Sequence, residues 1–243
     1  MPFALITGAC GGIGQALCDL FAEQGYSVIG VDCRTSNSFK HFLIDFDITL
    51  LCKYGEDAKS FLDQVDRATD GRLDVLINNA AVQVVKPFTD LTGTDWESTL
   101  NTNLLAPFWL IRLVYPYLKA ARGNVVNISS IHANLTKKNF AAYATSKGAL
   151  VAMTKSLAVE LAPEVRINAI LPAATDTPML RAGFSEDPAG FSELERYHPL
   201  GRIATPQDVS RAALFLAGRD AGFITGSALA VDGGIGGCLH DPA

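Results

Sequence analysis

The sequence predicts an α/β fold in a single domain, a doubly wound parallel sheet of about seven strands with helices on both faces. Short apolar stretches alternate along the chain with segments whose apolar residues recur at helical spacing. The short stretches are apolar on both faces, as strands are when helices cover both sides of a parallel sheet. The chain has 243 residues, 49% of them hydrophobic and 19% charged. This length suits one large core and is short for two domains.

The expected strands occupy 3–7, 27–32, 41–45, 73–78, 123–129, 166–171 and 228–233. Helical periodicity is clear at 15–24, 61–69, 96–121 and 143–161. Only residues 33–40 separate the second strand from the third, so we expect a loop or a single turn there instead of a helical crossover. Right-handed crossovers elsewhere give the doubly wound arrangement. The segment 179–198, which contains glycine and proline, is predicted to be a mobile flap within the same domain.

Composition argues against several classes of partner and site. Acidic and basic residues are interspersed and the net charge is −5, so no track for nucleic acid or anionic lipid is expected. No apolar run reaches the length of a membrane span, and the apolar start of the chain is predicted to be a strand instead of a secretory leader. The five cysteines form no CxxC pair. We therefore expect no metal site, no disulfide framework and a cytoplasmic location.

Residues 7–14 read TGACGGIG and lie between the first strand and the first helix. Gly8, Gly12 and Gly14 permit a tight turn and a close approach of the backbone to a pyrophosphate. The free N–H groups and the dipole of the helix N-terminus would bind that group. The spacing is not the general GxGxxG pattern, and a glycine-rich turn without a ligand is the alternative. Because strand, turn and helix occur in the required order, we favour a dinucleotide site.

Asp32 closes the second predicted strand. A carboxylate at this position can accept hydrogen bonds from both ribose hydroxyls of an adenosine, and it repels a 2′-phosphate. Neither Cys10 nor Gly11 in the turn supplies a compensating cation, and Arg34 is the nearby group that could tolerate a phosphate. We therefore expect NAD as the cofactor, in preference to NADP.

The stretch YATSK places Tyr143 and Lys147 four residues apart, on one face of a helix. A phenol is a poor acid–base group at neutral pH. A neighbouring ammonium, helped by a positively charged nicotinamide, would lower its pKa by favouring the phenolate. The pair alone is weak evidence, because such pairs are common on helices. Ser130, at the end of a predicted strand, could hydrogen bond the same substrate oxygen. Asn103, on the long middle helix, could hold a water that relays protons to Lys147.

In these motifs the chain resembles the short-chain dehydrogenase/reductase family, in its compact form, over essentially its whole length. The matching segments are TGACGGIG for the cofactor turn, NNAA (78–81) for the motif that lines the adenosine, INAILPAATDTPM (167–179) for the segment around the nicotinamide, and ITGSALAVDGG (224–234) for the last strand. The catalytic tetrad is matched by Asn103, Ser130, Tyr143 and Lys147. The resemblance implies a Rossmann-type fold, a homotetramer and an oxidoreductase that interconverts a secondary alcohol and a ketone.

The resemblance also implies a role for each member of the tetrad. Tyr143 would exchange the hydroxyl proton while hydride passes between the carbinol carbon and nicotinamide C4. Ser130 would position the oxygen, Lys147 would lower the pKa of Tyr143 and bind the nicotinamide ribose, and Asn103 would support the relay. The expected cofactor-binding residues are Gly8, Gly12, Ile13, Gly14, Asp32, Asp45, Phe46, Asn79, Ala80, Ala81, Tyr143, Lys147, Pro172, Thr175 and Thr177.

The chain departs from the family pattern at Ala81 and Ala173, where glycine is usual. Each alanine adds a methyl group close to the expected adenosine or nicotinamide, and it would be strained if its position required a positive φ. Residues 45–46 and residues 47–48 are both candidates for the contact between the third strand and the adenine. Of these, Asp45 is favoured.

Gln83 and His132 lie in loops that are expected to face the nicotinamide pocket. A similar glutamine and histidine occur in the family's 3-hydroxybutyrate dehydrogenases, where they help to hold a carboxylate. A loop histidine with a backbone partner is the alternative for His132. Phe140 stands where those enzymes place a lysine, and Lys137, Lys138 or Arg181 could substitute for it.

The expected substrate is a small polar hydroxy or keto compound. A 3-hydroxy acid, a sugar or polyol and a cyclic alcohol are the alternatives, and the short flap argues against a very large lipid. A function of another class is a non-catalytic dinucleotide-binding redox sensor, against which the complete tetrad argues. An epimerase or dehydratase of the extended branch would need a larger C-terminal domain than 243 residues allow.

Overall fold

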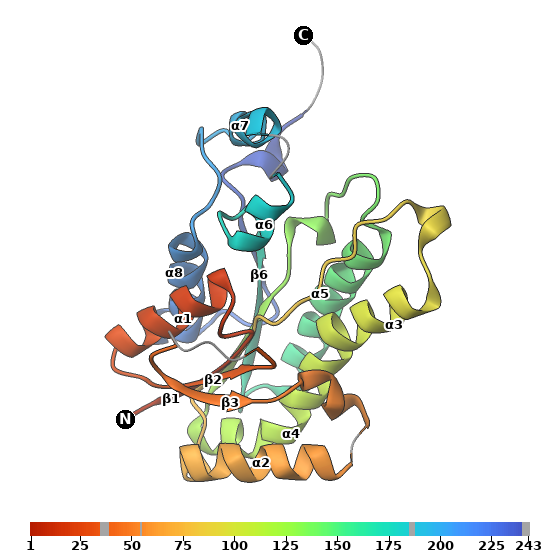
Figure 1. Ribbon diagram of the computed structural model, residues 1–243. Coiled ribbons are helices and arrows are strands. Elements are labelled where there is room, and N and C mark those ends of the chain that lie inside the picture. The colour runs from red at the N-terminus through yellow and green to blue at the C-terminus, as the bar shows by residue number, and fades with distance from the viewer. Residues whose placement is uncertain (35–38, 54, 185–187, 240–243) are drawn as a thin grey trace.

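The structure, a computed structural model, describes residues 1–34, 39–53, 55–184 and 188–239. One parallel sheet of seven strands has the order β3-β2-β1-β4-β5-β6-β7. Figure 1 shows this sheet among the helices that surround it. Its strands are β1 (Phe3–Thr7), β2 (Ser27–Asp32), β3 (Phe42–Asp45), β4 (Val75–Asn78), β5 (Asn124–Ile128), β6 (Arg166–Pro172) and β7 (Ala228–Val231). The predicted doubly wound sheet is confirmed, and the strands differ from their predicted bounds only at the ends.

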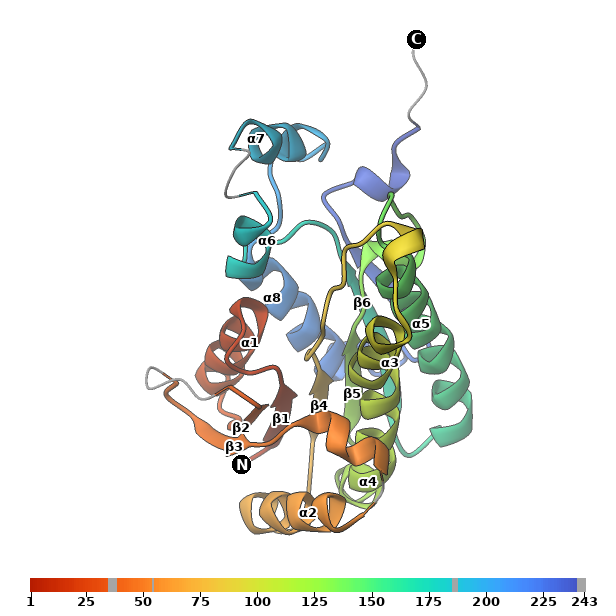
Figure 2. The same cartoon turned by 45° about the vertical axis from the view of Figure 1, so that its right-hand side comes forward.

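Helices cover both faces of the sheet (Figure 2). The core on one face comes from α1 and α8, and the core on the other from α2, α4 and α5. The helical periodicity of the sequence did not reveal α8. This helix lies between β6 and β7 in the sequence and packs on the sheet. The helices are α1 (Gly12–Glu23), α2 (Glu56–Thr69), α3 (Gly93–Leu100), α4 (Ala106–Ala121), α5 (Ala141–Leu161), α6 (Pro178–Ala182), α7 (Pro188–Arg196) and α8 (Pro206–Ala217).

The long helix predicted over 96–121 is interrupted. Between α3 and α4 the chain makes a π-helical turn, Asn101–Leu105. Such a turn widens the helix and shifts the faces that its side chains occupy, and it is frequent at functional sites. Asn103 lies within this turn and is 1% exposed. Asn103 therefore lies on the predicted middle helix, but in a π-helical turn that the periodicity did not reveal.

In the described part of the connection between β2 and β3 there is no helix, and residues 35–38 of this predicted loop lie outside the described residues. The aromatic ring of Phe39 covers the sheet here. A Cβ added to Gly30 would lie 2.6 Å from Cζ of Phe39 and 2.8 Å from Cβ of Ala9. A glycine on β2 therefore leaves the space that this ring needs.

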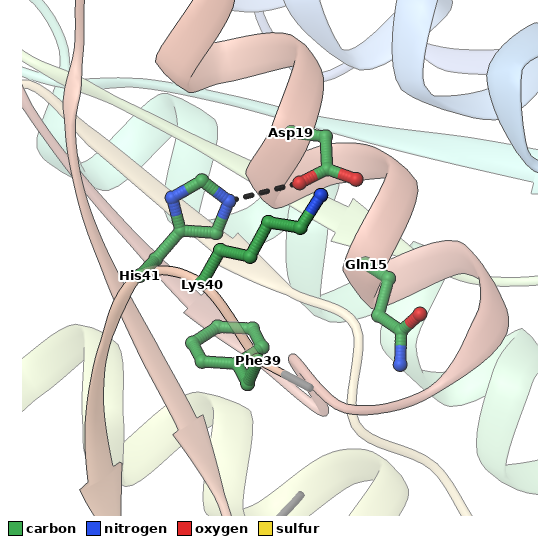
Figure 3. A pocket seen from close by; sticks show the side chains of 5 residues that line it. All are labelled: Gln15, Asp19, Phe39, Lys40 and His41. Carbon is green, nitrogen blue, oxygen red and sulfur yellow. Dashed lines mark hydrogen bonds and ion pairs between the residues drawn. The ribbon is translucent and has the colours of Figure 1, made fainter. Parts of the chain in front are cut away.

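A hydrogen bond joins the start of β3 to α1. Nε2 of His41 lies 2.9 Å from Oδ1 of Asp19, across a small hollow (Figure 3). The hollow has a volume of about 240 Å³ and is lined by Gln15, Asp19, Phe39, Lys40 and His41.

The last strand of the sheet, β7, differs from its prediction in its exposure. β7 was expected to be buried on both faces, but Ala228, Leu229 and Ala230 are exposed. The prediction is wrong because β7 is the edge strand and pairs with β6 on one side.

The predicted flap contains α6 and α7, above the carboxyl ends of the strands (Figure 1). Residues 185–187 of the flap lie outside the described residues. Among the helices that the structure describes, none combines the length and the apolar character needed to cross a bilayer.

The packing of Phe39 predicts that Gly30→Ala destabilises the protein. The added methyl group must displace either the ring or Ala9, so we expect the free energy of unfolding in urea to fall by about 1–3 kcal/mol. Gly93→Ala is the control, because a Cβ there meets no heavy atom within 4 Å, and it should stay within about 1 kcal/mol of the wild type. Equal effects of the two variants would contradict the packing argument.

Candidate functional site

The predicted site residues converge on the edge of the sheet where the strands end. In a parallel sheet all carboxyl ends lie at one edge, and ligands bind where the strand order reverses. Here the order reverses between β1 and β4. The turn after β1, Asp32 at the end of β2, the segment after β4, Ser130 after β5 and the segment after β6 meet around this point.

The glycine turn has the geometry of an anion cradle. Gly8 has a φ of +65°, and a Cβ at Gly14 would collide with the carbonyl oxygen of Gly8. Gly11 caps α1 without a side-chain hydrogen bond, so its first N–H groups have no capping side chain as acceptor. Ile13 is half-buried in the first turn of α1. These features fit the pyrophosphate of a dinucleotide.

The segment 79–82 is anchored to the end of β1. The backbone N–H groups of Asn79 and Ala80 both donate to Oγ1 of Thr7, at 3.0 Å each. Nδ2 of Asn79 donates to the carbonyl oxygens of Thr7 and Gly8, at 3.0 and 3.2 Å. A Cβ at Gly8 would lie 2.8 Å from Cα of Ala80. The predicted adenosine-lining motif is therefore held directly against the glycine turn.

Asp32 is 5% exposed and is oriented by two backbone N–H groups. Its Oδ2 accepts from Cys10 N and its Oδ1 from Arg34 N, both at 3.0 Å. Each carboxylate oxygen has a second lone pair that a ribose hydroxyl could use. Nε of Arg34 lies 3.6 Å from Oδ1 of Asp32. The cation that could tolerate a 2′-phosphate is thus partly neutralised by Asp32.

The two candidates for the adenine contact differ in their surroundings. Asp45 pairs in register with Asp32 and is exposed at the end of β3. Phe46 follows it, donates from its N–H to the carbonyl oxygen of Asp32 at 3.0 Å, and packs its ring against Phe61. Asp47 accepts from the N–H and the hydroxyl of Thr49. Its carboxylate stabilises the turn that follows β3.

The segment after β6 lies against the glycine turn. Pro172 ends β6, and Thr175 is buried with its hydroxyl bonded to the carbonyl oxygen of Ala173 at 3.1 Å. Thr177 caps α6 by accepting from Leu180 N. A Cβ at Gly12 would lie 3.1 Å from Cγ2 of Thr177 and from Cδ of Pro178.

The two alanines that replace family glycines are not strained. Neither Ala81 nor Ala173 has a positive φ. The strain that a positive φ would have caused is therefore absent at both positions.

Ser130, Tyr143 and Lys147 are brought together at the end of β5. Nζ of Lys147 lies 5.7 Å from the centroid of the Tyr143 ring and donates to the carbonyl oxygen of Ile128 at 2.8 Å. The Ser130 hydroxyl hydrogen bonds the Tyr143 side chain and also accepts from His132 N at 3.2 Å. The Ser130 and Tyr143 hydroxyls are therefore adjacent, and the Lys147 ammonium lies beside the Tyr143 ring.

Burial controls the titration of this cluster. Burial lowers the pKa of Lys147, which is 2% exposed, to about 8. Burial also raises the pKa of Tyr143, and the hydrogen bond from Ser130 opposes this shift only in part. In the protein alone the pKa of Tyr143 is therefore raised by desolvation of the phenolate, instead of lowered as expected.

The Asn103 side chain holds the segment after β4. Its Oδ1 accepts from Val82 N and its Nδ2 donates to Val82 O, both at 2.9 Å. The other N–H of the amide donates to Oγ of Ser146 at 3.0 Å, and Ser146 donates to Tyr143 O at 2.7 Å. Both amide N–H groups of Asn103 are thus used. Sequence reasoning missed Ser146, although it lies inside YATSK, three residues after the tyrosine.

The ring of His132 lies beside that of Tyr143. Its ring stacks on Phe140 with centroids 4.5 Å apart and planes at 4°, and it meets the Tyr143 ring edge-on at 5.7 Å. Its Nδ1 lies 3.2 Å from Oγ1 of Thr136, so its partner is a hydroxyl group instead of a backbone group. Burial and, to a smaller extent, Lys137 lower the pKa of His132 to about 4.

The other predicted substrate groups are exposed or paired with an acid. Gln83 is exposed on the segment after β4, and Lys138 is exposed in the loop before α5. The guanidinium of Arg181 binds both oxygens of Asp176, each at 2.6 Å. Sequence reasoning missed this pair.

The chain is similar to known proteins over nearly its whole length. The family model described as "Enoyl-(Acyl carrier protein) reductase" matches residues 8–236. A cyclopentanol dehydrogenase of Comamonas sp. (strain NCIMB 9872) is 35% identical over 244 residues, covering 95% of each protein. The ligand-free structure of Thermoplasma acidophilum aldohexose dehydrogenase is 33% identical, covers 100% of this chain and 96% of that chain, and has a TM-score of 0.94.

Two similar solved structures contain a nicotinamide cofactor. ElxO with NADP bound is 28% identical, covers 96% of this chain and 98% of its own, and has a TM-score of 0.86. The 3-ketoacyl-(acyl-carrier-protein) reductase from Brucella melitensis, complexed with NADH, is 28% identical. The match covers 97% of this chain and 98% of that chain and has a TM-score of 0.85. This chain is thus similar to proteins that bind either form of the dinucleotide.

The buried ammonium of Lys147 predicts a pH-dependent stability. Below about pH 8 the ammonium is charged in both states, and its burial destabilises the folded protein. Between about pH 8 and about pH 10 the folded protein releases this proton while the unfolded chain keeps it. The free energy of unfolding therefore rises with pH, by at most about 1.4 kcal/mol per unit. In urea titrations the wild type should gain stability relative to Lys147→Met over this range.

Lys155→Met is the matched control, because Lys155 is exposed on the same helix. It should follow the wild type at every pH. If Lys147→Met also followed the wild type, burial would not be what lowers the pKa of Lys147.

Proposed function

Because the chain belongs to the short-chain dehydrogenase/reductase family of oxidoreductases, we propose that it interconverts a secondary alcohol and a ketone with NAD, using Tyr143 as the acid–base group. The observation that carries this proposal is the cluster of Ser130, Tyr143 and Lys147 beside the switch point of the sheet. A phenol, a hydroxyl and an ammonium in this arrangement can bind one carbinol or carbonyl oxygen and move its proton.

Each residue has a distinct part in the proposed chemistry. A bound nicotinamide supplies the group that accepts or donates the hydride. Tyr143 exchanges the proton of the substrate hydroxyl, and Ser130 donates to or accepts from the same oxygen. Lys147, as an ammonium, favours the phenolate form of Tyr143 and binds the nicotinamide ribose. Asn103 keeps the segment after β4 in register with Tyr143 through Val82 and Ser146.

The choice of NAD rests on Asp32. Its carboxylate is buried, oriented by two N–H groups and placed at the end of β2. A 2′-phosphate next to it would bring two negative groups together at a place where Arg34 is already partly neutralised. Within the dinucleotide site we assign Gly8, Gly12, Ile13 and Gly14 to the pyrophosphate. The remaining contacts to the adenosine and the nicotinamide are assigned to Asp45, Phe46, Asn79, Ala80, Ala81, Pro172, Thr175 and Thr177.

The proposed substrate is a small polar hydroxy or keto compound, with Gln83, His132 and Arg181 as candidate contacts. A 3-hydroxy acid and a sugar or polyol are the alternatives. The cyclopentanol and aldohexose dehydrogenases among its relatives support an alcohol. We infer a single dinucleotide-binding domain that forms a homotetramer in the cytoplasm through its long helices, without nucleic-acid or membrane partners.

Tyr143→Phe tests the reaction. Loss of the hydroxyl removes the proton donor and acceptor, so turnover should fall by about 100- to 10,000-fold, followed as NADH absorbance over a panel of alcohols, hydroxy acids and sugars. Binding of NADH, followed by its fluorescence, should stay close to that of the wild type. Tyr115→Phe on α4 serves as the control. A non-catalytic redox sensor would show no turnover in either protein and would lose nothing in the variant.

Asp32→Asn tests the cofactor. The wild type should use NAD with a kcat/KM at least about tenfold higher than NADP, because the carboxylate repels the 2′-phosphate. The variant should lose most of this ratio, whereas Asp45→Asn at the end of β3 should keep it. A wild-type preference for NADP would overturn the assignment.

A further inference from the structure

Three successive residues at the end of β5 hold the helix α5. The carbonyl oxygen of Ile128 accepts from Nζ of Lys147 at 2.8 Å. Oγ of Ser129 donates to the main-chain carbonyl oxygen of Lys147 at 2.9 Å. The hydroxyl of Ser130 hydrogen bonds the side chain of Tyr143. The proposed reaction gives a task to Ser130 but none to Ser129.

Ser129 links the sheet directly to the main chain of α5. Its backbone N–H donates to the carbonyl oxygen of Ile170 on β6 at 2.8 Å, so the sheet fixes its position. The residue is 4% exposed, and a buried hydroxyl without a partner would be unfavourable. The carbonyl oxygen of Lys147 has two lone pairs, so it can accept this bond together with the bond inside the helix.

Hydrogen bonds of this kind fix the position of α5 along β5, because they are directional whereas apolar packing is not. Nδ2 of Asn127 donates to Oγ1 of Thr154 at 2.9 Å, two turns further along α5. Asn127 and Ser129 are two residues apart on an extended chain, so their side chains lie on the same face of the sheet. Of these two links, the one from Ser129 is at the end of α5 that carries Tyr143 and Lys147.

We propose that Ser129 is a positioning residue for the reaction, whose hydroxyl holds α5 where the Tyr143 hydroxyl and the Lys147 ammonium meet the substrate and the nicotinamide ribose. The inference rests on the proposed function and adds a residue to it. Without this hydroxyl, the main-chain carbonyl of Lys147 keeps its bond inside the helix, so α5 stays folded but can shift along the sheet. A misplacement of about 1 Å at a reacting group can lower a rate by about 100-fold.

Ser129→Ala tests this inference, because alanine removes the hydroxyl and adds no atom that could clash. With NAD and the alcohol that the wild type oxidises fastest, kcat should fall by about 10- to 100-fold. In calorimetric titrations NADH should bind about tenfold more weakly, because Lys147 no longer meets the nicotinamide ribose. ADP should bind as it does to the wild type, because it carries only the groups assigned to Asp32 and the glycine turn.

The pH dependence of kcat separates positioning from a merely structural role. Alcohol oxidation needs Tyr143 as a phenolate, and a nearby ammonium favours that form. In the described part of the chain, the titratable side chains with recorded contacts to the Tyr143 ring are Lys147 and His132, and burial keeps His132 uncharged at neutral pH. A displaced ammonium raises the pKa of Tyr143 in the complex. The pH at which kcat reaches half its plateau should therefore rise by about one unit in Ser129→Ala.

Ser210→Ala is the matched control. Ser210 is buried, and its hydroxyl donates to the carbonyl oxygen of Gln207 at 3.2 Å on α8, which lies across the sheet from α5. This variant should lower the thermal midpoint about as much as Ser129→Ala does. It should keep the wild-type kcat, pH profile and affinity for NADH.

The outcomes distinguish this inference from the proposed function. A wild-type kcat and pH profile in Ser129→Ala would overturn the inference and leave the proposed function intact. Equal losses of kcat in both alanine variants, or equal weakening of NADH and ADP, would show a structural role and overturn it as well. A wild type that binds no NADH and oxidises no alcohol of the panel would contradict the proposed function, and the inference with it.

Discussion

The contact between the end of β1 and the segment after β4 is the constraint on which the site depends. Gly8, with its positive φ, lies so close to Ala80 that no side chain fits between them. The Thr7 hydroxyl and the Asn79 amide close the same gap with hydrogen bonds. The order of the strands in the sheet reverses at this point. Every other part of the site, from Asp32 to the segment after β6, is placed relative to it.

A second constraint is the desolvation of ionisable groups around Tyr143. Burial acts in opposite directions on the two kinds of group, since it raises the pKa of the phenol and lowers the pKa of the ammonium and the imidazole. The same burial that makes Lys147 easier to deprotonate leaves His132 uncharged. The electrostatic character of the reacting centre therefore has one physical origin.

The parallel sheet and the positions of the catalytic candidates along it could be predicted because both depend on local patterns. Apolar stretches separated by helical segments define a parallel sheet, and residues that follow its strands must share one edge. The π turn at Asn103 could not be predicted, because it is stabilised by bonds to Val82 and Ser146, which lie far from it in sequence. The exposure of β7 was missed because edge position is a property of the whole sheet.

The sequence by itself determined the fold class, the glycine turn and the identity of the groups that meet at the carboxyl edge, because spacing and residue type dictate these. Only the tertiary structure decided how those groups are engaged. It paired Arg181 with Asp176, stacked His132 on Phe140 and turned the Asn103 amide toward Val82. The physical reason is that hydrogen bonds and desolvation depend on neighbours brought in from other elements, which no local pattern records.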